Sequence, residues 1–96
     1  MDVQHDPERG QFYIPLANGE EASLFYNMFS DDILDLRHTE VPRSARGQGL
    51  ADALVRFALA YVREHNLNLI VTCPFVQRWL RKHPEERPAG AVDRSG

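Results

Sequence analysis

The sequence V-P-R-S-A-R-G-Q-G-L-A-D-A-L-V, residues 41–55, joins an apolar stretch to a helical pattern through two glycines. Glycine adopts left-handed backbone angles that other residues avoid, so Gly47 and Gly49 allow a sharp loop directly ahead of a helix. The first N–H groups of a helix have no partner inside it, and they lie at the positive end of the helix dipole. The loop therefore predicts a binding site for an anion such as phosphate.

The helix that follows has the clearest pattern in the sequence. Over residues 50–65 apolar side chains recur at spacings of three and four, which places them on one face of a helix. Asp52 and Arg56 add a favourable charge pair one turn apart. Asn66 tolerates left-handed angles and can end the helix. The apolar positions are Leu50, Leu54, Phe57, Ala58, Tyr61 and Val62.

A second strand and helix follow. The short apolar run 67–72 predicts a strand, and residues 75–82 predict a helix with Trp79 on its buried side. Pro84 stops that helix. Residues 86–96 are polar and rich in proline and glycine, so we expect them to form a disordered tail.

The residues ahead of the loop predict an antiparallel meander. Residues 11–16 and 22–28 alternate apolar and polar side chains, and a third apolar run covers 33–41. The dipeptide Asn18-Gly19 lies between the first two runs. It predicts a tight hairpin turn in which both residues have positive φ.

The third run changes its inward face part of the way along. Leu34 and Leu36 share one parity, whereas Thr39 and Val41 share the other. A strand that shifts its face by one residue contains a bulge, here expected at residues 37–38. The alternative is a strand that ends at residue 38.

These elements predict one α+β domain over residues 1–85. The meander is joined to a strand–helix–strand–helix unit, and the two strands of the unit over 33–72 should pair in parallel through the helix. The expected architecture is a mixed sheet with two main helices.

Composition narrows the class of protein. The chain has 96 residues, of which 43% are hydrophobic, and no apolar run approaches the roughly 20 residues that span a membrane. The single cysteine, Cys73, excludes an internal disulfide and fits a reducing compartment. The N-terminus does not have the pattern of a signal peptide. We therefore expect a cytoplasmic protein without a membrane partner.

Charge is distributed unevenly. Residues 1–42 hold nine acidic residues and two arginines, whereas residues 43–84 hold seven arginine or lysine residues and two acids. A basic half that begins at the glycine loop suits an anionic ligand, and solvated charges segregated by chance are the alternative. We do not expect nucleic acid as a partner, because the pI is about 5.7 and no basic stretch carries interleaved aromatic residues.

Three kinds of phosphate-binding loop can be compared with the glycine loop. A nucleotide P-loop requires a lysine that is missing here, and a dinucleotide fingerprint requires a third glycine where Asp52 stands. The pattern R/Q-x-x-G-x-G/A is satisfied in full by the residues from Arg46 to Ala51. It is the pyrophosphate-binding motif of the GNAT superfamily of acetyl-CoA-dependent N-acetyltransferases.

The resemblance extends beyond the loop, over roughly residues 10–85. H-T-E-V-P (38–42), R-G-Q-G-L-A (46–51) and C-P-F-V-Q-R-W-L-R-K-H-P-E (73–85) resemble the short single-domain GNAT-like proteins. The resemblance implies a reduced GNAT fold, without the first helices and last strands of longer members. It also implies transfer of an acetyl group from acetyl-CoA to an amine acceptor, such as a protein lysine or a polyamine. We expect no metal, and a monomer or weak dimer.

The resemblance also implies where acetyl-CoA would bind. The pyrophosphate would lie on the amides of residues 46–51, the pantetheine arm would pair with residues 38–41, and the thioester would lie near the end of the next strand. Basic residues of the last helix, such as Arg78, are either a solvated face or contacts for the CoA 3′-phosphate. The implied cofactor-binding residues are Thr39, Glu40, Val41, Arg46, Gly47, Gln48, Gly49, Leu50, Ala51 and Cys73.

Two residues are candidates for catalysis. His38 can deprotonate an ammonium group, because an imidazole titrates near pH ~6.5, or it can merely pack on the sheet. Cys73 can accept the acetyl group, form a mixed disulfide with CoA, or serve as a small buried hydrophobe. Many family members protonate the leaving thiolate with a tyrosine of the last helix, but no tyrosine follows Tyr61. The alternative function is therefore a non-catalytic acyl-CoA-binding or regulatory module.

Overall fold

The computed structural model describes residues 2–95, which form a six-stranded mixed sheet with two helices. The strands follow one another in chain order, antiparallel from β1 to β4 and parallel from β4 to β6. The expected α+β class is confirmed. The strands are β1 (Gln4–Asp6), β2 (Gln11–Pro15), β3 (Glu21–Ser30), β4 (Ile33–Glu40), β5 (Asn68–Val71) and β6 (Val92–Asp93), and the helices are α1 (Leu50–Glu64) and α2 (Pro74–Lys82).

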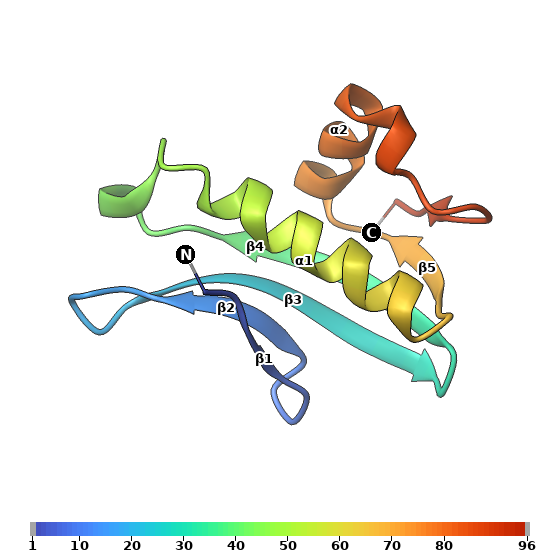
Figure 1. Cartoon of the computed structure of the whole chain (residues 1–96), viewed down its shortest axis with the longest axis horizontal. Helices are drawn as coiled ribbons and strands as arrows, with labels where there is room; N and C mark the ends of the chain where they lie inside the picture. The colour runs from blue at the N-terminus through green and yellow to red at the C-terminus, as the bar shows by residue number, and fades with distance from the viewer. Residues whose placement is uncertain (1, 96) are drawn as a thin grey trace.

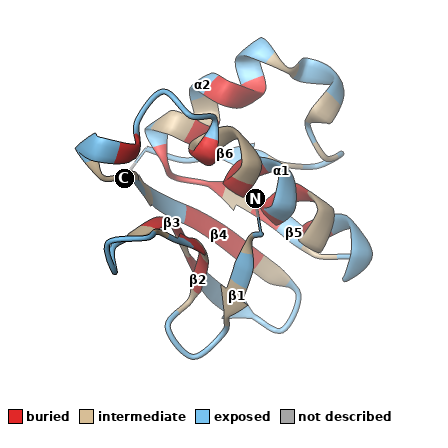
Figure 2. Ribbon diagram, turned by 60° about the vertical axis from the view of Figure 1, so that its left-hand side comes forward, coloured by how far each residue is buried: buried red, intermediate tan, exposed pale blue. Residues whose placement is uncertain are grey.

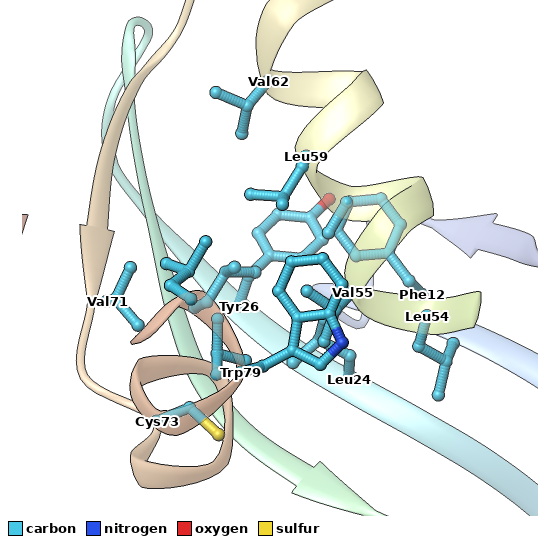
Figure 3. Packing of buried hydrophobic residues seen from close by; sticks show 14 of the residues in the cluster. Phe12, Leu24, Tyr26, Leu54, Val55, Leu59, Val62, Val71, Cys73 and Trp79 are labelled. Carbon is cyan, nitrogen blue, oxygen red and sulfur yellow. The ribbon is translucent and has the colours of Figure 1, made fainter. Parts of the chain in front are cut away.

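The core lies between the sheet and the helices. Helix α1 runs across the sheet and contacts β2, β3 and β4, while α2 contacts β4 and β5 (Figure 1). Buried residues gather on both helices and on the central strands (Figure 2). Trp79 of α2 joins Val55 of α1 and Leu24 of β3 in one cluster, where each fully buried large side chain contributes about 1.5–3 kcal/mol (Figure 3). Neither helix in residues 2–95 has the length and apolar character that crossing a membrane requires.

The bulge expected in the third run is confirmed. Phe25 of β3 pairs with His38, but the next residue, Tyr26, pairs with Leu36, so Arg37 is the extra residue on β4. The shift explains the change of parity in the sequence. It lets Leu36 before the bulge and Thr39 after it face the same side of the sheet.

The β2–β3 hairpin differs from its expected geometry. Of the two turn residues only Gly19 has positive φ, at 85°, whereas Asn18 does not. The amide of Gly19 donates to the carbonyl of Leu16, and the amide of Leu16 donates to the carbonyl of Glu20. These bonds define a three-residue loop, a type I turn followed by a left-handed glycine. The prediction of a two-residue turn was wrong, because three residues, 17–19, lie outside the hydrogen-bond ladder of β2 and β3.

The tail also differs from the expectation. Residues 84–86 form a short 3-10 turn, and β6 pairs in parallel with β5, so the segment predicted to be disordered extends the sheet. The amide of Arg94 donates to the carbonyl of Val71, and the Gln77 side chain donates to the carbonyl of Arg94. A ladder of backbone hydrogen bonds does not depend on apolar side chains, so composition alone misses it.

Candidate functional site

A cavity of about 630 Å³ lies where the end of β4, the glycine loop and the starts of both helices meet. In Figure 1 this is the region where the chain leaves β4, turns and enters α1. The cavity joins the basic loop to the last helix. Its lining residues are Thr39, Val41, Ala45, Arg46, Gly47, Gly49, Leu50, Ala51, Asp52, Phe75 and Arg78.

The loop has the backbone conformation that its glycines allow. Gly47 and Gly49 have φ of 80° and 75°, and Gly49 is the residue directly ahead of α1. A Cβ atom added at either position would have no heavy atom within 4 Å, so both glycines face open space. The requirement for glycine is therefore a matter of backbone angles, and the space in front of the helix N-terminus is free for a ligand.

Asp52 lines the cavity, and its carboxylate is already paired with two hydrogen-bond donors. Its carboxylate accepts hydrogen bonds from Trp79 Nε1 at 2.9 Å and from Arg56 Nε at 3.0 Å. Burial works to raise the pKa of this carboxyl, but the bonds from Trp79 and Arg56 outweigh it and lower the pKa below its ordinary value. The pairing neutralises a charge that would otherwise repel a phosphate.

Strands β4 and β5 separate beside the cavity. Their pairing runs up to Leu36 and Val71, after which β4 continues to Glu40 without a partner on its β5 side among the described residues. The amides of Thr72 and Cys73 both donate to the carbonyl of Leu36 and close the paired part. The backbone of residues 38–40 is thus a free strand edge that leads from the loop toward the end of β5.

Cys73 lies at the point where the two strands part. It is 2% exposed, and its Sγ lies 3.2 Å from Oγ1 of Thr39, a residue that lines the cavity. Figure 3 shows the sulfur at the junction between β5 and α2, at the border of the core. The thiol therefore lies directly under the cavity wall.

His38 and Cys73 lie on opposite sides of the sheet. Thr39 pairs with the fully buried Leu24, so it faces the helices, and the preceding residue His38 must face away from them. On that far face the His38 ring stacks on Phe25, and its Nε2 lies 3.3 Å from a carboxylate oxygen of Glu40. Both side chains are mainly exposed. The structure does not bring the two catalytic candidates together.

Most of the predicted cofactor-binding residues line the cavity, and three do not: Glu40, Gln48 and Cys73, which lies beneath Thr39. Gln48 is exposed and is absent from the lining, and the Glu40 side chain points to the far face. The motif did not point to Phe75, whose position at the start of α2 depends on the tertiary fold. Arg78 also lines the cavity, one turn along α2, which favours the phosphate-contact alternative for this residue. Among residues 2–95 no group of three or more His, Cys, Asp or Glu side chains has the arrangement of a metal site.

Comparison with known proteins agrees with the geometry. Residues 11–88 match a family model described as GCN5-related N-acetyl-transferase. The chain is 40% identical to Protein NATD1 of Gallus gallus over 86 residues, which cover 88% of this chain and 77% of the relative. It is 42% identical to Protein NATD1 of Bos taurus over 84 residues, which cover 85% of this chain and 74% of the relative.

A solved structure has the same fold. The NMR solution structure of a GCN5-like candidate N-acetyltransferase from Staphylococcus aureus superposes with a TM-score of 0.72, covers 99% of this chain and 89% of its own, and is 24% identical in sequence. The extent of the family match and the identity to the curated relatives decide the assignment. The chain belongs to the family of GCN5-related N-acetyltransferases.

Proposed function

We propose that the protein transfers the acetyl group of acetyl-CoA to an amine, with the pyrophosphate held by the glycine loop. The observation that carries the proposal is the loop itself: two left-handed glycines face open space at the N-terminus of α1, beside a free strand edge that leads to Cys73. Acetyl-CoA supplies an activated acyl group. The remaining steps depend on residues of this chain.

The residues around the cavity match the successive parts of acetyl-CoA. The amides at residues 46–51 would bind the pyrophosphate, with Arg46 at the rim, and the free edge at residues 38–41 would hold the pantetheine arm as an added strand does. The thioester would then lie beside Cys73. A backbone N–H at the bulge of residue 37 would stabilise the negative charge that develops on the acetyl oxygen.

Direct transfer suits Cys73 better than a covalent relay. A thiol becomes a good nucleophile when a base removes its proton, but the recorded partner of Cys73 Sγ is the neutral hydroxyl of Thr39. Cys73 would therefore support the cavity wall from behind Thr39, close to the thioester, and the acetyl group would pass straight to the amine.

The acceptor would approach from the far face of the sheet. The pairing of β4 with β5 ends at Leu36 and Val71, and beyond that point His38 and Glu40 lie on the far face with their side chains exposed. His38 would take the proton that an ammonium group must lose before its nitrogen can attack, with Glu40 beside the ring. The acidic side chains of the first forty residues favour a cationic acceptor, such as a lysine side chain or a polyamine.

The release of free CoA tests the proposed activity. The protein is mixed with acetyl-CoA and a panel that includes polyamines, lysine peptides and aromatic amines, which are uncharged at neutral pH. We expect release that requires an amine and is faster with the cationic acceptors. Equal rates for charged and uncharged amines would remove the acceptor preference but leave the transferase.

A non-catalytic acyl-CoA-binding module is the second candidate. It is favoured by the absence of any tyrosine after Tyr61, since α2 offers the buried Trp79 instead of a phenolic acid. Calorimetry with acetyl-CoA separates the two candidates. Binding of acetyl-CoA without CoA release for every amine would support the module and contradict the transferase.

His38→Gln tests the proposed base. We expect kcat/KM for the amine to fall by about 100- to 10,000-fold, the range typical for loss of a general base, while the affinity for acetyl-CoA stays the same. His65→Gln is the matched control, because His65 is an exposed imidazole at the far end of α1. Equal turnover in the native protein and His38→Gln would assign His38 a packing role only.

A further inference from the structure

A second cavity, of about 540 Å³, lies on the far face of the sheet, at the start of β3 and the end of β4. It shares Val41 and Arg46 with the first cavity, so only the end of β4 and the start of the loop separate the two. Phe25, which lines it, also stacks on the His38 ring. The cavity is therefore adjacent to the place where the acceptor amine is proposed to react.

The floor of this cavity is a buried polar row. Gln11 and Ser23 are only 2% and 3% exposed. Gln11 Nε2 donates to Glu21 Oε1 at 3.0 Å and to Ser23 Oγ at 2.6 Å. Its carbonyl oxygen Oε1 is buried without a hydrogen-bond partner among the described residues. Buried polar atoms are nearly always paired in folded proteins, so this oxygen indicates a missing donor.

Carboxylates around the cavity also lack positively charged partners. Arg9 is already occupied by Asp6 at 2.8 Å and by Glu21 at 3.5 Å. Glu20, on the same hairpin, has no cationic partner recorded in residues 2–95, and Glu40 has only the His38 ring beside it.

The loop side of the cavity carries two guanidinium groups. Arg46 Nε donates to the carbonyl of Val41, and Arg43 lines the cavity next to it. Apart from Arg9, whose charge is paired with Asp6 and Glu21, the positive groups that line the cavity lie on the loop side and the acceptors on the hairpin side. A cation would be repelled from the loop and drawn toward Gln11 and Glu21.

We infer that this cavity binds an ammonium group of the acceptor, and specifically a second one that does not react. The inference rests on the proposed acetyl transfer. The nitrogen that attacks the thioester must be neutral, so a cavity that recognises positive charge cannot hold it in its reactive state. The cavity instead anchors the other end of a dicationic amine, while the reacting end reaches the gap between β4 and β5. Gln11, Glu21 and Glu40 are then specificity-determining residues, and the acceptor class is a diamine or longer polyamine.

Two probes of equal chain length test the inference. Cadaverine carries an ammonium group at each end, whereas pentylamine carries one ammonium and a methyl group. Each is titrated into the native ¹⁵N-labelled protein, and the side-chain amide of Gln11 is followed by NMR, which needs no turnover. We expect cadaverine to shift this signal saturably and to bind about tenfold more tightly than pentylamine, as expected for one charged hydrogen-bonded contact.

Matched variants locate the effect. Glu21→Gln keeps the size and an acceptor for Gln11 but removes the charge, and we expect it to lower the affinity for cadaverine about tenfold with little change for pentylamine. Glu40→Gln is a second variant at an exposed position. Glu8→Gln, which removes one exposed carboxylate away from the cavity, should bind like the native protein.

The outcomes distinguish this inference from the proposed function. Equal affinity for both probes, shifts confined to other residues, or an unchanged cadaverine affinity in both Glu21→Gln and Glu40→Gln would overturn the subsite. In the CoA-release assay Glu21→Gln should raise the KM for cadaverine and leave kcat unchanged. Absence of CoA release with every amine, together with a Gln11 shift on adding cadaverine, would refute the transferase and keep the ammonium site.

Discussion

Gly49→Glu is expected to weaken acetyl-CoA binding by at least about 100-fold. Gly49 faces open space at the mouth of the cavity, so a glutamate there would extend toward the ligand without a clash. Its carboxylate would stand where the pyrophosphate is proposed to lie, and opposed like charges cost several kcal/mol. A loss of about 2.7 kcal/mol already corresponds to 100-fold. Calorimetric titration with acetyl-CoA measures the change.

Gly49→Ala is the control that isolates the charge. Both variants force a side chain onto a residue with φ of 75°, which costs about 1–2 kcal/mol of backbone strain in either case. Only the glutamate adds the negative charge. We expect Gly49→Ala to retain measurable affinity in a folded protein. If both variants bind equally well, the loop serves to start α1, and the pyrophosphate lies elsewhere.

The sequence predicts the features that depend on local chemistry. Gly47 and Gly49 predict the left-handed loop because few other residues adopt those angles, and the structure confirms both. The change of parity between Leu36 and Thr39 predicts the bulge because the pleat of a strand leaves no other way to keep both residues inward. Asn66 follows the C-terminal end of α1 with φ of 52°. This is the left-handed conformation that asparagine tolerates and that the sequence predicts there.

The features that the sequence does not predict are those made by distant segments. The strand at Val92–Asp93 exists because β5 offers a free backbone edge, which leaves no trace in the composition of the tail. The second cavity forms only where Gln11 and Glu21, one on each strand of the β2–β3 hairpin, lie beside the end of β4. No motif of fixed spacing describes such a meeting. The opposite placement of His38 and Cys73 likewise became clear only from the pairing of β3 with β4.

His38 and Cys73, the two catalytic candidates, lie on opposite sides of the sheet, and this divides the site into two halves. The loop and Cys73 face the helices, where acetyl-CoA is proposed to enter, and His38 and Glu40 face the opposite side, where the amine is proposed to enter. The free edge of β4 lies between them. A variant of the loop should therefore change the affinity for acetyl-CoA alone, whereas a variant of the far face should change the kinetics of the amine alone.

Gly10→Ala is expected to destabilise the whole fold by about 2–5 kcal/mol. A Cβ at Gly10 would lie 2.4 Å from the backbone carbonyl oxygen of Tyr26, and φ there is 61°. The left-handed strain costs about 1–2 kcal/mol, and overpacking against a backbone atom adds about 1–3 kcal/mol. The hydrogen bond from the Tyr26 amide to the Gly10 carbonyl, 2.8 Å long, would also be disturbed. Urea denaturation measures the free energy of unfolding.

Gly19→Ala separates the clash from the strain. Gly19 has φ of 85°, but a Cβ there meets nothing within 4 Å. Gly19→Ala should therefore lower the free energy of unfolding only by the backbone strain, about 1–2 kcal/mol. The free energy of unfolding of a small domain is roughly 5–15 kcal/mol in total. Gly10→Ala should therefore leave part of the protein unfolded at elevated temperature. Its folded fraction should still bind acetyl-CoA with native affinity, because Gly10 lies outside the lining of the first cavity, where acetyl-CoA is proposed to bind. Equal stability of the two variants would mean that β2 and β3 move apart at this point without loss, and the close approach at Tyr26 would not constrain the fold.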